Sequence, residues 1–244
     1  MNSVPPTALE TDPTQIRRML TALVPGVYEV RIPRGDARKP RFFGTQHMYL
    51  QLPDDLAAGV KHIASVKGTN AAAVYMVGNP VNPALLGRGR GAFYTAKSTA
   101  SDDDVTRRRL LYLDIDAVRP SAINANAQEI EAVTERTAAV VEWLRAETDF
   151  GTPLFHGTSG SGGMVLYRVD MPNDETSANT VQACLAALSE AYTDAVVNVD
   201  TGVYNAARIF RVPGTINAKS NTPQPDRPWT VVTGTWADGE VSHE

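Results

Sequence analysis

Apolar and polar positions alternate most regularly between Leu110 and Asp116. In an extended strand, positions i and i+2 point to the same face, so the alternation gives this stretch two different sides. One side carries Tyr112, Asp114 and Asp116, and the other carries Leu111, Leu113 and Ile115. The pattern predicts a strand that is buried on one side and open to a cleft on the other.

The rest of the chain combines helical and strand-like patterns. Apolar residues at helical spacing predict helices over 13–23, 53–66, 126–147 and 175–191. Alternating or β-branched stretches predict strands over 27–32, 72–77, 153–155, 164–169, 197–200 and 229–233. This mixture predicts an α+β fold. We expect an N-terminal α/β part over 1–77, a catalytic core over 78–220, and a C-terminal linker and strand over 221–244.

Composition limits the classes of protein to consider. The chain has 244 residues, 43% of them hydrophobic, which is enough for a sizeable core. The formal net charge of −4 argues against wrapping of nucleic acid by the whole surface but allows a local basic groove. The single cysteine, Cys184, excludes an internal disulfide, and there is no Cys/His cluster at zinc spacing. No apolar run is long enough to span a membrane, so we expect a cytosolic protein.

Carboxylates provide the first candidate chemistry. Asp114 and Asp116 would lie about 6 to 7 Å apart on one face of the strand, a spacing that suits divalent cations. Asp200 follows a short Val-rich strand and is a candidate third ligand, although an aspartate that merely starts a turn is common in this context. The acidic run 102–104 precedes three arginines and is more typical of a helix start than of a metal site.

A glycine-rich turn and a cationic segment provide candidate phosphate contacts. The turn at Thr158–Gly163 allows backbone N–H groups to converge, and Ser159 and Ser161 add hydroxyl donors; a plain hairpin loop is an equal alternative. No Gly-Lys-Ser/Thr closes the turn, so it is not a P-loop. Arg208, Arg211 and Lys219 lie in an otherwise apolar segment, where cations need anionic partners.

Basic residues elsewhere are candidates for DNA contacts. Arg88 and Arg90 belong to a Gly/Asn/Pro/Arg-rich stretch over 78–95, which is either a surface loop or a flexible flap over a phosphate backbone. Arg107 and Arg108 precede the carboxylate strand.

Three motifs follow one another along residues 78–220. They are Asp114-Ile115-Asp116, the Ser-Gly-x-Gly turn at Ser159 to Gly162, and Asp200 followed by Asn205-Ala206-Ala207-Arg208 and Arg211-Val212-Pro213-Gly214-Thr215. In this order they resemble the archaeo-eukaryotic primase superfamily, and most of all the primase-polymerase (prim-pol) domains of phage and plasmid replication primase-helicases. The resemblance implies two juxtaposed α/β units around a cleft, with a mixed, largely antiparallel sheet.

The resemblance also implies roles for residues. Asp114, Asp116 and Asp200 would bind two Mg or Mn ions, without zinc. Ser159, Gly160, Gly162 and Arg208 would contact the nucleotide phosphates, with Arg211 and Lys219 nearby. The family histidine that contacts the triphosphate is replaced here by Met164, which cannot donate a hydrogen bond. His156 and Arg208 are the candidate substitutes.

We therefore expect template-directed primer synthesis or extension on single-stranded DNA from NTPs or dNTPs. The resemblance places the protein in a bacterial host cytoplasm, with a helicase module in the full-length protein or in trans. Two alternatives are a sugar-nucleotide transferase, which also uses Asp-x-Asp, and a non-catalytic replication-initiator domain that binds DNA through its arginines.

Overall fold

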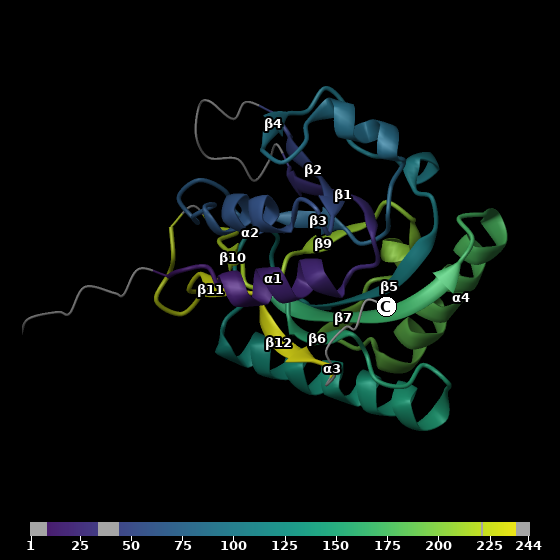
Figure 1. The fold of residues 1–244 in the computed structure, drawn as a ribbon. Helices are drawn as coiled ribbons and strands as arrows, with labels where there is room; N and C mark the ends of the chain where they lie inside the picture. Colours follow the sequence, from purple (N-terminus) through teal and green to yellow (C-terminus); the bar gives the residue numbers. More distant parts are fainter. Residues whose placement is uncertain (1–8, 34–43, 221, 238–244) are drawn as a thin grey trace, which may run out of the picture.

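Two five-stranded antiparallel sheets form the framework of the protein. A computed structural model describes residues 9–33, 44–220 and 222–237 (Figure 1). The first sheet has the order β4 (Tyr94–Thr95), β2 (Gln46–Leu52), β1 (Gly26–Ile32), β3 (Tyr75–Val77) and β9 (Ile209–Arg211). The second has the order β12 (Thr233–Trp236), β6 (Phe155–Thr158), β7 (Gly162–Met171), β5 (Arg108–Ala117) and β8 (Val197–Val199).

Helices and short elements complete the α+β fold, which confirms the predicted class. The helices are α1 (Pro13–Ala22), α2 (Leu56–Ala64), α3 (Ala127–Glu147) and α4 (Glu175–Tyr192). Three 3-10 turns are η3 (Pro83–Arg88), η4 (Asp102–Asp104) and η5 (Thr201–Tyr204), and β10 (Ile216–Asn217) pairs with β11 (Thr230–Val231). Within the two sheets every strand pair is antiparallel, so neither is a mixed sheet.

Local sequence accounts for the helix starts. The Asp12 carboxylate accepts hydrogen bonds from the backbone of Thr14 and Gln15, and Pro13 occupies the first turn of α1. Asn126 and Glu129 form a reciprocal capping box at the start of α3. The four predicted helices are confirmed, although α2 begins at Leu56, three residues after the predicted start.

Sequence analysis missed β2. Its residues Met48, Leu50 and Leu52 pack toward α1 and α2, whereas His47 and Tyr49 face the other side of the sheet. The alternation of these residues was a usable strand signal.

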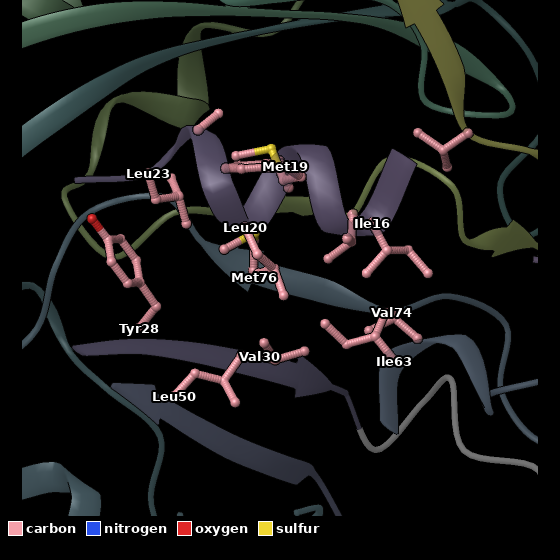
Figure 2. Packing of buried hydrophobic residues seen from close by; sticks show 14 of the residues in the cluster. Ile16, Met19, Leu20, Leu23, Tyr28, Val30, Leu50, Ile63, Val74 and Met76 are labelled. Carbon is pink, nitrogen blue, oxygen red and sulfur yellow. The ribbon is translucent and has the colours of Figure 1, made fainter. Parts of the chain in front are cut away.

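Hydrophobic residues between α1, α2 and the first sheet form part of the main core. In Figure 2, Ile16 and Leu20 of α1 point toward strand residues that include Val30 and Met76, and Met19 belongs to the same cluster. The same core continues to Phe155, Met164 and Phe210, and so it joins the two sheets (all its members are buried).

The predicted two-sided strand is confirmed in β5. Leu111, Leu113 and Ile115 belong to a second core that packs against α3 and α4. These helices lie along the second sheet, with α3 across its lower face in Figure 1. Asp114 and Asp116 alternate with these apolar residues, so they face away from α3 and α4, toward the first sheet.

The stretch 78–95, predicted to be a surface loop or a flexible flap, is partly buried together with the residues up to 105. Val81, Leu85, Ala100 and Val105 are buried against the first sheet in a third core. The fully buried carboxylate of Glu29 accepts a hydrogen bond from the backbone N–H of Ala100 and another from the hydroxyl of Tyr49. Val81 and Leu85 therefore anchor 78–95 to the first sheet, whereas Arg88, Arg90 and Tyr94 are exposed, and the role of the stretch as a flap stays a prediction.

The two sheets are not contiguous in sequence. β9, from the predicted core 78–220, joins the first sheet, and β12, from the predicted C-terminal part, joins the second. The domain boundaries at 77 and 220 therefore stay predictions. Residues 1–8, 34–43, 221 and 238–244 lie outside the described parts of the chain. Among the helices of the described residues, none is both long and apolar enough to cross a membrane.

Candidate active site between the two sheets

The three candidate aspartates meet where β5 and β8 run side by side. Ile115 pairs with Val199, and the backbone N–H of Asp200 donates to the carbonyl oxygen of Asp114 at 2.9 Å. Asp116 lies two residues further along β5, on the same side as Asp114. The structure thus brings Asp114, Asp116 and Asp200 together at one edge of the second sheet.

Negative charge at this edge is incompletely compensated. Burial, Asp116 and Asp200 raise the pKa of Asp114 to about 7, against the lowering effect of a hydrogen bond from Tyr112 and the charge of Arg211. Burial and the two neighbouring carboxylates oppose ionisation of Asp114, and a bound cation would favour its ionised form. The donor set therefore fits a hard divalent ion, which prefers oxygen ligands.

Asp114 and Asp116 suit a metal site better than all three aspartates together do. Within the described ranges, no three His, Cys, Asp or Glu side chains are grouped so that they could hold one metal ion. One carboxylate oxygen of Asp200 instead accepts a hydrogen bond from the backbone N–H of Gly202 at 2.7 Å. Asp114 and Asp116 are therefore the candidate metal ligands on β5, and a ligand role for Asp200 stays a prediction.

The glycine-rich turn lies directly beside Asp116. Gly162 is the cross-strand partner of Asp116, and a Cβ atom on Gly162 would lie only 2.6 Å from the Asp116 Oδ1. Gly160 has φ +90°, a left-handed conformation that favours glycine. The backbone N–H groups of Ser159 and Gly160 are used inside the turn, by the Gly162 carbonyl oxygen and the Thr158 hydroxyl.

Neither serine hydroxyl of the turn projects freely into the cleft. Ser161 is fully buried, and its hydroxyl accepts hydrogen bonds from the Nδ2 of Asn217 and the N–H of Ala125. Ser159 is 3% exposed and contacts Arg211. The expected donor role of Ser161 is therefore corrected to a structural one, because its hydroxyl is enclosed by the protein.

Two cations from the segment after Asp200 face the aspartates. Arg211 donates to the carbonyl oxygen of Ser159 at 3.0 Å and to its hydroxyl at 3.3 Å, and it reaches Tyr75. Burial alone would lower the pKa of Arg211, but Tyr75, Tyr112 and Asp114 together raise it. Burial and the nearby Arg211 lower the pKa of Lys219 to about 8, although Asp116 opposes the shift.

Arg208 lies close to the turn that follows Asp200. Its guanidinium donates to the carbonyl oxygen of Gly202, two residues after Asp200. It also lines a pocket whose wall includes Tyr112 and Phe210, two aromatic rings with centroids 5.7 Å apart.

Sequence analysis missed two contributors to this site. Arg119 pairs with Asp116 at 3.5 Å, and its side chain is only 6% exposed. Its position three residues after Asp116 was the available signal. Tyr75 was assigned only to a strand, and its contact with Arg211, 136 residues away, left no local signal.

The position of the expected histidine is occupied by a buried methionine. Met164 is the cross-strand partner of Asp114 and belongs to the core between the sheets. His156 pairs instead with Val165, whose side chain packs toward α3 and α4. Direct cross-strand partners share a face, so His156 lies on the opposite side of the sheet from Asp114. This placement corrects the expectation that His156 replaces the histidine.

The candidate DNA-binding arginines are all involved in contacts within the protein. Arg90 forms a bidentate ion pair with Asp55, and Arg107 pairs with Asp170 at the surface. Arg88 is exposed at the end of η3 and interacts with Tyr49. Arg108 is 6% exposed and donates to the Tyr204 carbonyl oxygen at 2.7 Å, so its candidate role on DNA is corrected to an internal one.

The chain is similar to known proteins in its fold, not in its sequence. No protein-family model matches the sequence, and no curated protein matches it. Among solved structures, the fold is similar to the primase RepB', with 11% identity, a TM-score of 0.45, and coverage of 91% of this chain and 55% of that chain. The chain thus spans about half the length of that structure.

A second solved structure is the polymerase domain of ligase D from Mycobacterium tuberculosis in complex with DNA. It has 14% identity and a TM-score of 0.47, with coverage of 89% of this chain and 79% of that chain. At such low identity the likeness describes folds, and roles must be argued from the residues of this chain. The chain is therefore similar in fold to a primase and to the polymerase domain of a ligase.

Proposed function

We propose that the chain is a metal-dependent nucleotidyltransferase that makes or extends primers on single-stranded DNA from NTPs or dNTPs. The observation that carries the proposal is that Asp114 and Asp116 share one face of β5, with Asp200 hydrogen-bonded to the Asp114 backbone and the Arg211 charge acting on Asp114. Phosphoryl transfer needs groups that position the reactants and neutralise charge, and these residues offer both signs of charge.

Each residue has a distinct part in this proposal. Asp114 and Asp116 would hold Mg or Mn, with Asp200 as third ligand. Bound divalent ions supply a lowered pKa for the attacking 3′-hydroxyl and charge neutralisation at the leaving pyrophosphate. Lys219 and Arg208 would bind the triphosphate from the protein side.

Arg211 and the turn around Ser159 have a supporting part. The Arg211 guanidinium holds Ser159 through both of its oxygens, which fixes the turn beside Asp116. Gly162 leaves the space that the Asp116 carboxylate occupies. Together Arg211, Ser159 and Gly162 would hold the turn beside Asp116 in one position before the nucleotide binds.

The two alternatives account for less of this arrangement. A sugar-nucleotide transferase would use Asp114 and Asp116 but has no need of Asp200 or of the cations opposite. An initiator domain would rely on exposed arginines, and Arg90 and Arg107 are already paired with Asp55 and Asp170. The template, a helicase partner and a bacterial host cytoplasm belong to the same proposal as the primase-polymerase activity.

Incorporation of labelled nucleotides tests the proposal. The protein is incubated with single-stranded DNA, Mn²⁺ and labelled NTPs or dNTPs, with and without a primer. We expect product from the wild type and loss of product in Asp114→Ala and Asp116→Ala. The matched control is Asp103→Ala, an exposed aspartate outside the site. Product that persists in the two site variants contradicts the proposal, and turnover of UDP- or GDP-sugars without a template supports the transferase instead.

A further inference from the structure

The segment 204–207, between Asp200 and Arg208, is fixed by side chains from a distant part of the chain. Arg108 donates to the Tyr204 carbonyl oxygen at 2.7 Å, and the Asn79 Nδ2 donates to the Ala206 carbonyl oxygen at 2.9 Å. The Asn79 Oδ1 also accepts from the backbone of Arg109 and Leu110 at the start of β5. The segment is therefore tied to the strand that carries the candidate metal ligands.

Asp102 makes the most direct contact with this segment. Its Oδ1 accepts hydrogen bonds from the Asn205 Nδ2 at 3.0 Å and from the Ala207 backbone N–H at 2.7 Å. Although Asp102 itself is exposed, its carboxylate satisfies the backbone of the residue immediately before Arg208. Hydrogen bonds to an ionised acceptor are stronger than those between neutral groups.

Asp102 is itself well anchored. It begins η4, where Ser101 and Asp104 form a reciprocal capping box. The Nδ2 of Asn173 donates to the carbonyl oxygens of Asp102 and Val105, at 2.8 and 2.9 Å. An anchored carboxylate can restrict a loop, whereas a mobile one would move with it.

The hydrogen bonds of Asp102 fix the backbone next to Arg208, a candidate phosphate ligand. Its backbone N–H donates to the Asn205 carbonyl oxygen at 3.1 Å, so Asn205 and Ala207 define its backbone position. Its guanidinium then spans from the Gly202 carbonyl oxygen to the pocket beside Tyr112. A shift of the segment 205–207 would displace this guanidinium from both.

We propose that Asp102 is a positioning residue for Arg208, which it holds in place for the triphosphate by fixing the segment 205–207. This inference rests on the proposed function, because it assigns Arg208 to the nucleotide. Asp102 does not touch the reacting atoms. Its carboxylate acts through two hydrogen bonds, and only one of its oxygens accepts them, so an asparagine at this position can preserve both.

Nucleotide affinity provides the test, independently of turnover. The probe is the non-cleavable α,β-imido analogue of dATP with Mn²⁺, measured by isothermal titration calorimetry. We expect Asp102→Ala to weaken binding about tenfold, since it removes a charged acceptor from two donors. Asp102→Asn should remain within about twofold of the wild type, and the exposed neighbour Asp103→Ala should match it. In steady-state incorporation, Asp102→Ala should raise KM for the nucleotide more than it lowers kcat.

A double-mutant cycle separates positioning from general destabilisation. In an Arg208→Ala background, Asp102→Ala should have almost no further effect on nucleotide affinity. If Asp102→Ala fails to fold, Asn205→Ala removes one of the two hydrogen bonds and should show the same effect at smaller size.

The outcomes distinguish this inference from the function on which it rests. Unchanged affinity in Asp102→Ala, or an equal loss with and without Arg208, overturns the positioning role and leaves the nucleotidyltransferase proposal intact. Failure of the wild type to bind the analogue or to incorporate any nucleotide overturns the proposed function, and with it the role of Asp102.

Discussion

Arg211 in the first sheet donates hydrogen bonds to both the carbonyl and the hydroxyl oxygen of Ser159 in the second, at 3.0 and 3.3 Å. Both contacts come from Nη1, whereas Nη2 of the same guanidinium donates to the Tyr75 hydroxyl at 3.4 Å, so one buried side chain links the two sheets. Because the planar fork of arginine directs its two terminal nitrogens to different partners, lysine cannot reproduce the set.

Arg211→Lys should retain the charge but lose this geometry. We expect a fall in nucleotide incorporation of about 10- to 100-fold and a loss of about 1–3 kcal/mol in the free energy of unfolding. Incorporation assays and urea unfolding measure the two effects. Ser159→Ala is the matched control, since it removes the hydroxyl acceptor but keeps the carbonyl, and it should cost less in both. Equal activity in Arg211→Lys and the wild type would contradict this role.

Asp114→Asn should stabilise the metal-free protein at alkaline pH. The pKa of Asp114 is raised to about 7 in the folded protein, first by burial and then by Asp116, so the folded state binds its proton more tightly than the unfolded state. Its contribution to stability is therefore favourable at low pH and is lost as the pH rises through about 7.

The melting temperature in EDTA, compared between variant and wild type, measures this effect. The advantage of Asp114→Asn should be full at pH 8, decline as the pH falls from about 7, and be nearly absent near the ordinary aspartate pKa of 3.8. Added Mn²⁺ should then raise the melting temperature of the wild type more than that of the variant. A variant that melts below the wild type at pH 8 in EDTA contradicts the assigned shift.

Gly162→Ala should impair metal binding without a comparable loss of folding. The new Cβ would lie 2.6 Å from the Asp116 Oδ1 and 2.9 Å from the Ile115 carbonyl oxygen, so the carboxylate must move. We expect weaker Mn²⁺ binding by electron paramagnetic resonance and reduced incorporation. Gly87→Ala is the control, because a Cβ there has no atom of the described residues within 4 Å. Wild-type Mn²⁺ affinity in Gly162→Ala would show that Asp116 is not a ligand.

Met164→His should strengthen nucleotide binding and lower the stability of the protein. Met164 lies opposite Asp114 on the same face, so an imidazole there can donate a hydrogen bond to a phosphate. We expect KM for the nucleotide to fall about fivefold, whereas the burial of a polar ring in the core lowers the melting temperature. Met164→Leu should leave KM unchanged. A KM that does not fall in Met164→His indicates that Arg208, Arg211 and Lys219 already suffice.

Local patterns predicted much of the fold because they are set by near neighbours. The alternation at 110–116 identified both the buried and the open face of β5, and Asp12 and Asn126 marked helix starts. Contacts between distant segments were not predictable in this way. The pairing of β9 with β3 brings Arg211 to Tyr75, and nothing in either stretch specifies the other.

The register of the β6–β7 hairpin shows the same limit within a single motif. His156 and Met164 are eight residues apart, and the turn geometry decides that they lie on opposite faces. The partial burial of the stretch 78–95 was not predicted for a related reason. Its glycines and arginines suggested exposure, but Val81 and Leu85 are buried, and two isolated apolar side chains leave no periodic signal.

The crossing of β9 into the first sheet has a consequence for how the protein unfolds. The acidic residues belong to one sheet and Arg211 to the other, so a metal–nucleotide complex would bind both sheets at once. A ligand of this kind stabilises only states in which both sheets are folded. We expect the bound protein to lose its two sheets in a single cooperative transition, with slow amide hydrogen exchange extending from β5 to β9.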